Sequence, residues 1–102
     1  MKIDYQIQLL DDVIIEIESA KIWYNSRVEG LVDVFVEEIR NGIDIIHSSP
    51  LLFPTYFLSH RKYICGRFPF RIFYKLNQRK HLIIITSVLH EKRSLINLSN
   101  RK

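Results

Sequence analysis

Hydrophobic and polar residues alternate strictly at the start of the chain. The apolar positions are Ile3, Tyr5, Ile7 and Leu9, and the polar ones between them are Lys2, Asp4, Gln6 and Gln8. A period of two puts all the apolar side chains on the same side of an extended backbone. The pattern therefore predicts a first strand with one buried face.

The spacing of apolar residues then changes to that of helices. Asp11 or Asp12 offers an N-cap, and the helix should end near Ser26 because Gly30 interrupts the pattern. Its apolar stripe consists of Leu10, Val13, Ile14, Ile17, Ala20 and Tyr24. A second stripe, which ends at Ser48-Ser49-Pro50, consists of Leu31, Phe35, Ile39, Ile43 and Ile46. We expect two helices that pack on each other as an αα-hairpin.

Both predicted helices also carry apolar residues outside these stripes. They are Ile15 and Ile22 in the first helix and Val32 and Val36 in the second. We expect these side chains to pack one helix on the other. The alternative is an apolar patch for a partner protein.

The pattern in the second half of the chain predicts strands. A second strand extends from Tyr56 to Cys65, and its polar centre at residues 59–62 is either a loop or an exposed part of the strand. Residues 68–76 and 82–89 form a third and a fourth strand around a turn at residues 77–80. The order β-α-α-β-β-β predicts an α+β domain in which the helix hairpin covers one face of a mainly antiparallel, four-stranded sheet.

Side-chain parity in the last two strands predicts which residues share the uncovered face. If Leu76 pairs with His81 across the turn, Arg71 lies opposite Thr86 and Arg67 lies opposite His90. The uncovered face would then carry Arg67, Arg71, Phe73, Thr86 and His90. A shift of the register by one residue would send His90 to the helix side.

Composition and charge agree with one compact globular domain. The chain has 102 residues, 47% of them hydrophobic and 25% charged, with a net charge of +4. Residues 1–54 hold ten acidic and four basic residues, whereas residues 55–102 hold one acidic and eleven basic residues. Either the two halves contact different partners, or an acidic helical layer simply covers a basic sheet.

Several classes of protein are excluded or disfavoured. The single Cys65 has no partner for an internal disulfide and reads as a structural thiol. The four histidines are scattered and the three glycines stand apart, so we expect no metal site, no nucleotide loop and no cofactor. Neither a signal peptide nor a membrane-spanning segment is evident, which predicts a soluble, cytoplasmic protein.

An ordered series of residues resembles the RelE/ParE superfamily of toxins from type II toxin–antitoxin systems. The series is Trp23-Tyr24, Gly30-Leu31, Phe35, Phe53-Pro54, Arg61, Phe68-Pro69-Phe70-Arg71-Ile72, Tyr74, Val88-Leu89-His90 and Arg93. The resemblance implies one toxin domain over residues 1–102, with a basic tail from about residue 94. It also implies a cognate antitoxin protein that neutralises the chain. The ParE and plasmid-stabilisation branch is the more similar one.

Two toxin activities follow from the resemblance. ParE-type members poison DNA gyrase, and RelE-type members are ribosome-dependent, metal-independent endoribonucleases that cut mRNA. In the ribonuclease reading, Arg71 and His90 match the catalytic residues, although no Glu stands in residues 59–67 to serve as the base. The residues expected to bind the target are Arg61, Lys62, Arg67, Phe73, Lys92 and Arg93.

Three alternatives stay open at this point. His90 also fits a structural role at a strand end, and Arg71 also fits an exposed ion pair, for example with an acidic antitoxin. The chain as a whole also fits a non-toxic member of the superfamily that only binds its antitoxin.

Overall fold

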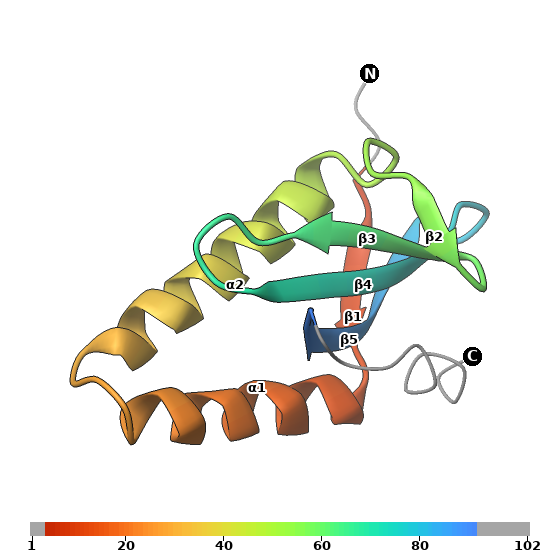
Figure 1. Ribbon diagram of the computed structural model, residues 1–102. Helices are drawn as coiled ribbons and strands as arrows, with labels where there is room; N and C mark the ends of the chain where they lie inside the picture. Colours follow the sequence, from red (N-terminus) through yellow and green to blue (C-terminus); the bar gives the residue numbers. More distant parts are fainter. Residues whose placement is uncertain (1–3, 92–102) are drawn as a thin grey trace.

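The computed structural model describes residues 4–91 and contains two helices and five strands (Figure 1). In chain order they are β1 (Gln6–Leu9), α1 (Asp11–Asn25), α2 (Leu31–Ser48), β2 (Thr55–Phe57), β3 (His60–Ile64), β4 (Phe70–Asn77) and β5 (Leu82–His90). The strands form one sheet in the order β1-β5-β4-β3-β2. β1 is parallel to β5, and the other neighbours are antiparallel. The predicted α+β class is confirmed, but the sheet has five strands where the sequence suggested four.

The extra strand arises because the predicted second strand is a hairpin. Leu58 and Ser59 have φ angles of 47° and 65°, so the chain reverses between β2 and β3. Tight hairpin turns of this kind usually contain Gly or Asn, and neither residue is present here to signal the turn. Of the polar residues 59–62, Ser59 therefore lies in the turn, as the loop alternative predicted, and residues 60–62 belong to β3.

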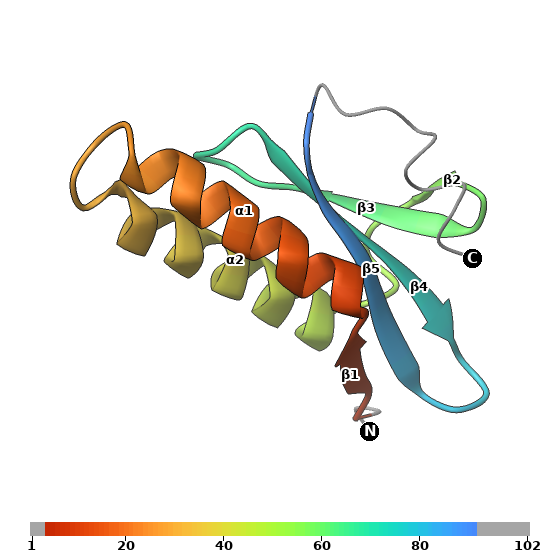
Figure 2. The ribbon, with the colours of Figure 1, turned by 90° about the horizontal axis from the view of Figure 1, so that it is seen from below.

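Both helices lie on one side of the sheet, and within residues 4–91 no helix lies on the other side (Figure 2). α1 begins at Asp11 and has Leu10 as its N-cap, so the predicted capping by Asp11 or Asp12 is wrong. The backbone N–H of Leu10 still bonds to the carbonyl of Ile85 at 3.1 Å, which ties the cap position to the sheet. Asp11 and Asp12 instead lie in the first turn, where the helix dipole favours negative charge.

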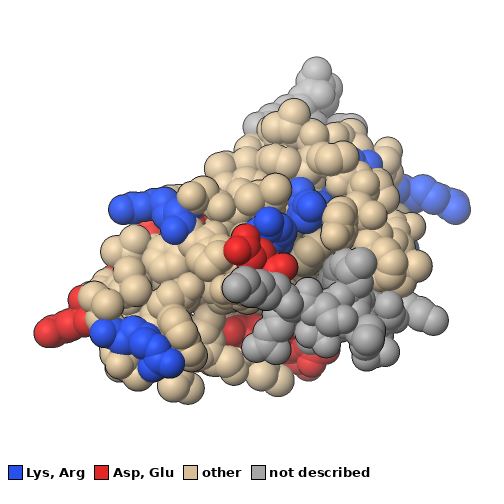
Figure 3. All heavy atoms as spheres, in the orientation of Figure 1, with Lys and Arg blue, Asp and Glu red and all other residues tan. Residues whose placement is uncertain are grey.

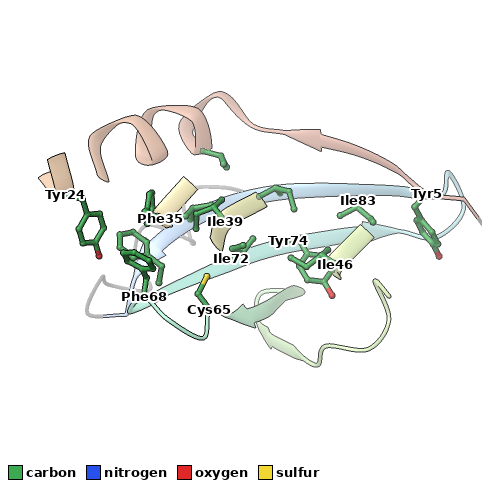
Figure 4. Close-up of a cluster of buried hydrophobic side chains, with 14 residues drawn as sticks. Tyr5, Tyr24, Phe35, Ile39, Ile46, Cys65, Phe68, Ile72, Tyr74 and Ile83 are labelled. Carbon is green, nitrogen blue, oxygen red and sulfur yellow. The ribbon is translucent and has the colours of Figure 1, made fainter. Parts of the chain in front are cut away.

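The main core fills the space between the helices and the sheet (Figure 4). One end of it is aromatic: the Phe35 ring lies 5.1 Å from those of Tyr24 and Phe70 and 5.4 Å from that of Phe68. Most residues of the two predicted stripes belong to this core, as do Val32 and Val36. These parts of the helix prediction are confirmed.

Three isoleucines of α1 depart from the expectation. Ile14 was assigned to the buried stripe, yet it is exposed. Ile15 and Ile22 were expected to pack helix on helix, but they are 62% and 72% exposed. The reason is geometric: α2 and β5 contact α1 from its inner side, so these three residues on the opposite side of the helix stay exposed.

α2 packs closely on the sheet at Gly42. A Cβ atom at this position would lie 2.7 Å from Cδ1 of Ile72 and 2.8 Å from Cε2 of Tyr63. Any side chain larger than a hydrogen atom would therefore require Ile72, Tyr63 or the helix itself to shift.

Phe35→Ala is expected to lower the free energy of unfolding by about 3–5 kcal/mol, because it empties the centre of the aromatic cluster. Urea denaturation monitored by circular dichroism measures this change. Ile22→Ala is the matched control, since it truncates an exposed apolar residue of the helical layer and should change stability by less than about 0.5 kcal/mol. Equal losses in both variants would contradict this description of the core.

Candidate functional site

The pairing of β4 with β5 decides which side chains share a face of the sheet. The pairing starts with Asn77 opposite Leu82, and Phe73 lies opposite Ser87. Between these two pairs β5 contains one extra residue, Thr86, which forms a β-bulge. The hydroxyl of Thr86 is buried and donates a hydrogen bond to the Phe73 carbonyl at 3.2 Å.

The predicted register is wrong from the turn onward, because Leu76 lies opposite Ile83 and not opposite His81. That difference alone keeps the predicted side-chain parity, and the bulge reverses it. Arg71 lies opposite Leu89, not opposite Thr86, and His90 lies opposite Phe70, not opposite Arg67. An extra residue in one strand flips every later side chain to the other face. The ring of His90 accordingly lies edge-on to Phe70, with 5.5 Å between the centroids. Because Phe70 belongs to the main core, Arg71 and His90 lie on opposite sides of the sheet.

The side of the sheet away from the helices carries a second, smaller set of side chains. Ile64 pairs with Arg71 and Arg71 with Leu89, while Lys62 pairs with Phe73. Phe73 and Leu89 form an apolar cluster with Phe57 that is separate from the main core. We call Lys62, Ile64, Arg71, Phe73 and Leu89 the uncovered face, because neither α1 nor α2 packs on it, although Phe73 and Leu89 are each only 6% exposed.

Arg71 already has a negative partner on this face. Its Nη1 lies 3.5 Å from Oε2 of Glu91, and the two side chains are 25% and 42% exposed. The backbone N–H of Glu91 donates to the carbonyl of Pro69 at 2.8 Å, which holds Glu91 beside the start of β4. Figure 3 shows a positive and a negative group side by side near the middle of this face. The interpretation of Arg71 as part of an exposed ion pair is therefore confirmed, although the partner lies in the same chain.

A second cation on this side of the sheet, Lys62, is held by an aromatic ring. Nζ of Lys62 lies 3.8 Å from the ring centroid of Tyr56, a cation–π contact. The Tyr56 ring is half exposed, and its centroid lies 6.0 Å from that of Phe73. Lys62 and Phe73, both predicted to bind the target, are thus brought together, and Tyr56 joins them through the β2–β3 hairpin that the sequence did not reveal.

The remaining predicted residues are dispersed. Arg61 pairs with core residue Tyr74, and its Nη1 donates to the Phe53 carbonyl at 2.6 Å, which is a structural contact. Arg67 is exposed in the bend between β3 and β4 and is not part of a strand. Lys92, Arg93 and the predicted basic tail lie outside the described residues.

Sequence reasoning also missed Glu16 of α1. Its carboxylate accepts hydrogen bonds from the backbone N–H of Val88 at 2.8 Å and from the hydroxyl of Ser87 at 3.2 Å. β1 pairs only with the first half of β5, so Glu16 satisfies a backbone donor on the edge that β1 leaves open. No periodicity in the sequence marks this role.

Cys65 directly follows β3 and is buried. Burial raises the pKa of its thiol to about 11, and the nearby carboxylate of Glu38 acts in the same direction, while Arg71 lowers it. A thiol with such a pKa is protonated at neutral pH and is a poor nucleophile. The prediction of a structural thiol agrees with this environment.

Two further findings concern residues 4–91 only. These residues contain no group of three or more His, Cys, Asp or Glu side chains arranged to hold a metal ion. Neither helix in this part of the chain has the length and apolar character needed to cross a bilayer.

The fold resembles that of solved toxin structures. A structure of the chromosomal ParDE toxin–antitoxin system of P. aeruginosa matches with a TM-score of 0.75 and 11% identity, over 85% of this chain and 96% of the other. The isolated E. coli RelE toxin matches with a TM-score of 0.61 and 14% identity, over 94% of both chains. The toxin–antitoxin complex RelBE2 of Mycobacterium tuberculosis matches with a TM-score of 0.56 and 12% identity, over 86% of this chain and 99% of the other.

This chain has the RelE/ParE fold. No family model and no curated protein matches the sequence. At 11–14% identity, the RelE/ParE likeness rests on backbone geometry and covers nearly the whole of both molecules in each comparison.

Cys65 should be alkylated by iodoacetamide far more slowly in the folded protein than in urea, because only about one thiol in a thousand is ionised at pH 8 when the pKa is about 11. The raised pKa also predicts the direction in which the free energy of unfolding changes with pH. The folded state retains the proton between the ordinary pKa of 9.0 and about 11, so the free energy of unfolding should fall as the pH rises through this range.

The control is Cys65→Ala, which should remove the thiol component of this pH dependence. Similar alkylation rates with and without urea would show that the thiol is not buried.

Proposed function

We propose that this protein is the toxin of a type II toxin–antitoxin system, acts in the cytoplasm, and inhibits growth by ParE-like action on DNA gyrase. We choose DNA gyrase over RNA as the target because Arg71 and His90 are separated. The two residues that would perform RNA cleavage lie on opposite sides of the sheet.

The chemistry of RNA cleavage explains why this separation matters. A ribonuclease needs a base for the 2′-hydroxyl, an acid for the leaving oxygen and cations for the phosphate, all within hydrogen-bonding reach of one nucleotide. Arg71 faces away from the helices, whereas His90 contacts Phe70 on the helix side. An inhibitor of gyrase needs a binding surface and no such constellation, so it is compatible with this arrangement.

A RelE-like ribonuclease is the second candidate, and one contact favours it. The carboxylate of Glu91 lies 3.5 Å from Arg71, which brings a possible base and a cation together on the same face. Sequence reasoning looked for this base in residues 59–67, where no Glu occurs. A non-toxic protein that binds only its antitoxin is the third candidate.

The expected partner is a cognate antitoxin. The structure of RelBE2 from Mycobacterium tuberculosis is that of a toxin–antitoxin complex, and this chain has the same fold. The exposed apolar residues Ile15 and Ile22 on α1 offer surface for such a partner.

Expression of the chain alone in bacteria should arrest growth, and co-expression of the adjacent antitoxin gene should restore it. With gyrase as the target, the arrested cells should show double-strand DNA breaks and an SOS response while their mRNA stays intact. Pulsed-field gels and mapping of RNA ends measure the two outcomes. Unimpaired growth despite abundant folded protein would contradict the toxin proposal and favour the non-toxic binder.

His90→Ala should retain growth arrest, because a gyrase inhibitor needs no acid or base. In a ribonuclease that used His90, the same substitution would reduce cleavage on the order of 10²-fold. Thermal unfolding of the variant shows whether it is still folded. Cuts within translated codons that vanish in His90→Ala or in Arg71→Ala would replace the gyrase proposal with the ribonuclease one.

A further inference from the structure

The hairpin that joins β4 to β5 carries a group of cations at its tip. Residues 75–81 contain Lys75, Arg79, Lys80 and His81 and no acidic residue. Arg79, Lys80 and His81 are exposed, and Lys75 is partly exposed. None of the three ion pairs within residues 4–91 involves these side chains.

Most of the other cations in the basic half of the chain already have a partner. Residues 55–91 contain seven Lys and Arg residues. Arg61 donates to a backbone carbonyl, Lys62 lies over an aromatic ring and Arg71 pairs with a carboxylate. Arg67 lies by itself in the bend between β3 and β4, and the remaining three belong to this hairpin. The hairpin is therefore the place where several cations of the sheet are available together to an external anion.

The backbone of the tip is fixed by hydrogen bonds. The backbone N–H of Lys80 donates to Oδ1 of Asn77 at 3.1 Å, and that of His81 donates to the carbonyl of Gln78 at 3.3 Å. The carbonyl of His81 accepts a hydrogen bond of 2.9 Å from the backbone N–H of Gln6, the first residue of β1. A ligand that binds to this tip therefore does not have to order its backbone.

The hairpin also projects from the body of the molecule. The turn between β4 and β5 extends past both helices (Figure 2). Figure 3 shows a positively charged side chain at this end of the molecule, with no negative group next to it on the visible face. Asp4, two residues before the start of β1, is the carboxylate closest to the tip along that segment, and it forms no ion pair with the hairpin.

The composition of the tip indicates the class of ligand. Residues 77–81 are Asn-Gln-Arg-Lys-His, so they offer neither the apolar anchor of a protein interface nor an aromatic platform for unstacked bases. Duplex DNA needs neither, because it presents one phosphate charge per about 1.7 Å of its axis. A two-stranded ribbon also fits the major groove of B-DNA, whereas the major groove of A-form RNA is too narrow to admit one.

We propose that the β4–β5 hairpin binds the phosphate backbone of double-stranded DNA through Lys75, Arg79 and Lys80. The inference rests on the proposed function only in that gyrase holds duplex DNA, so the hairpin would contact the DNA while other surfaces contact the enzyme. Because no side chain of the tip is positioned by a partner to select a base, we expect binding without sequence preference.

The chain provides a matched control for the charge of the hairpin. The double variant Arg79→Gln/Lys80→Gln removes two positive charges from the tip. The double variant Lys21→Gln/Arg40→Gln removes two positive charges from the helical layer, where each side chain is paired with a Glu. Both variants have the same net charge, so a difference between them reports the position of the charge.

Fluorescence anisotropy with the purified full-length chain and a labelled DNA duplex of about 20 base pairs measures binding at about 50 to 200 mM salt. Each lost phosphate contact should reduce the slope of log K against log salt by about 0.9, so the hairpin variant should lose about 1.8. Its affinity at the lowest salt concentration should fall at least about tenfold. The helical-layer variant should keep the slope of the unmodified chain, and thermal unfolding shows whether both variants are folded.

Three results would overturn the proposal. An unchanged slope in the hairpin variant would show that the tip contacts no phosphate. Equal losses in the two variants would show that only net charge matters. Tighter binding of an RNA duplex or of single-stranded DNA of the same sequence would assign the hairpin to another nucleic acid. These measurements do not depend on toxicity, so failure here and failure of the growth assay are distinguishable.

Discussion

The pairing of β4 with β5, with its bulge at Thr86, is the constraint on which the rest of the structure depends. β5 is also the strand to which β1 attaches, and α1 follows β1 directly. Before the bulge, β5 pairs with both β1 and β4. After the bulge, the carboxylate of Glu16 on α1 accepts the hydrogen bond from the backbone N–H of Val88, which β1 does not reach. The hydrogen bond from Thr86 to the Phe73 carbonyl stabilises the step between the two registers.

The same bulge separates two environments that carry different chemistry. Phe70 and His90 turn toward the aromatic core, whereas Arg71 and Leu89 turn away from it. A partly buried position beside the core suits an imidazole that packs on a ring, and a partly exposed position suits a guanidinium that binds an anion. The guanidinium of Arg71 and the imidazole of His90 therefore lie on different sides of the sheet.

The charge asymmetry of the chain corresponds to two layers of the fold. The acidic first half forms the helices, where Lys21 pairs with Glu18 and Arg40 with Glu37. The basic second half forms most of the sheet, where Arg71 pairs with Glu91. Each of these pairs joins residues of one layer. The helical layer and the sheet therefore have surfaces of opposite charge. This difference is separate from the attraction between the two layers.

The sequence by itself determined most of the helix stripes, the main part of the first strand and the α+β class, because periodicity is a local property that each segment carries alone. The resemblance to RelE/ParE toxins came from an ordered series of residues and not from periodicity. The β2–β3 hairpin and the bulge at Thr86 were decided by the tertiary structure. Each depends on one or two residues whose backbone angles or pairing cannot be predicted from the neighbouring residues. Leu58 and Ser59 turn the chain without Gly or Asn. Thr86 is an extra residue in an apolar strand, and the residues on the two faces of that strand are alike. One such residue reverses every side chain that follows, which is why the sequence identified Arg71 and His90 but only the folded chain showed that they lie on different sides.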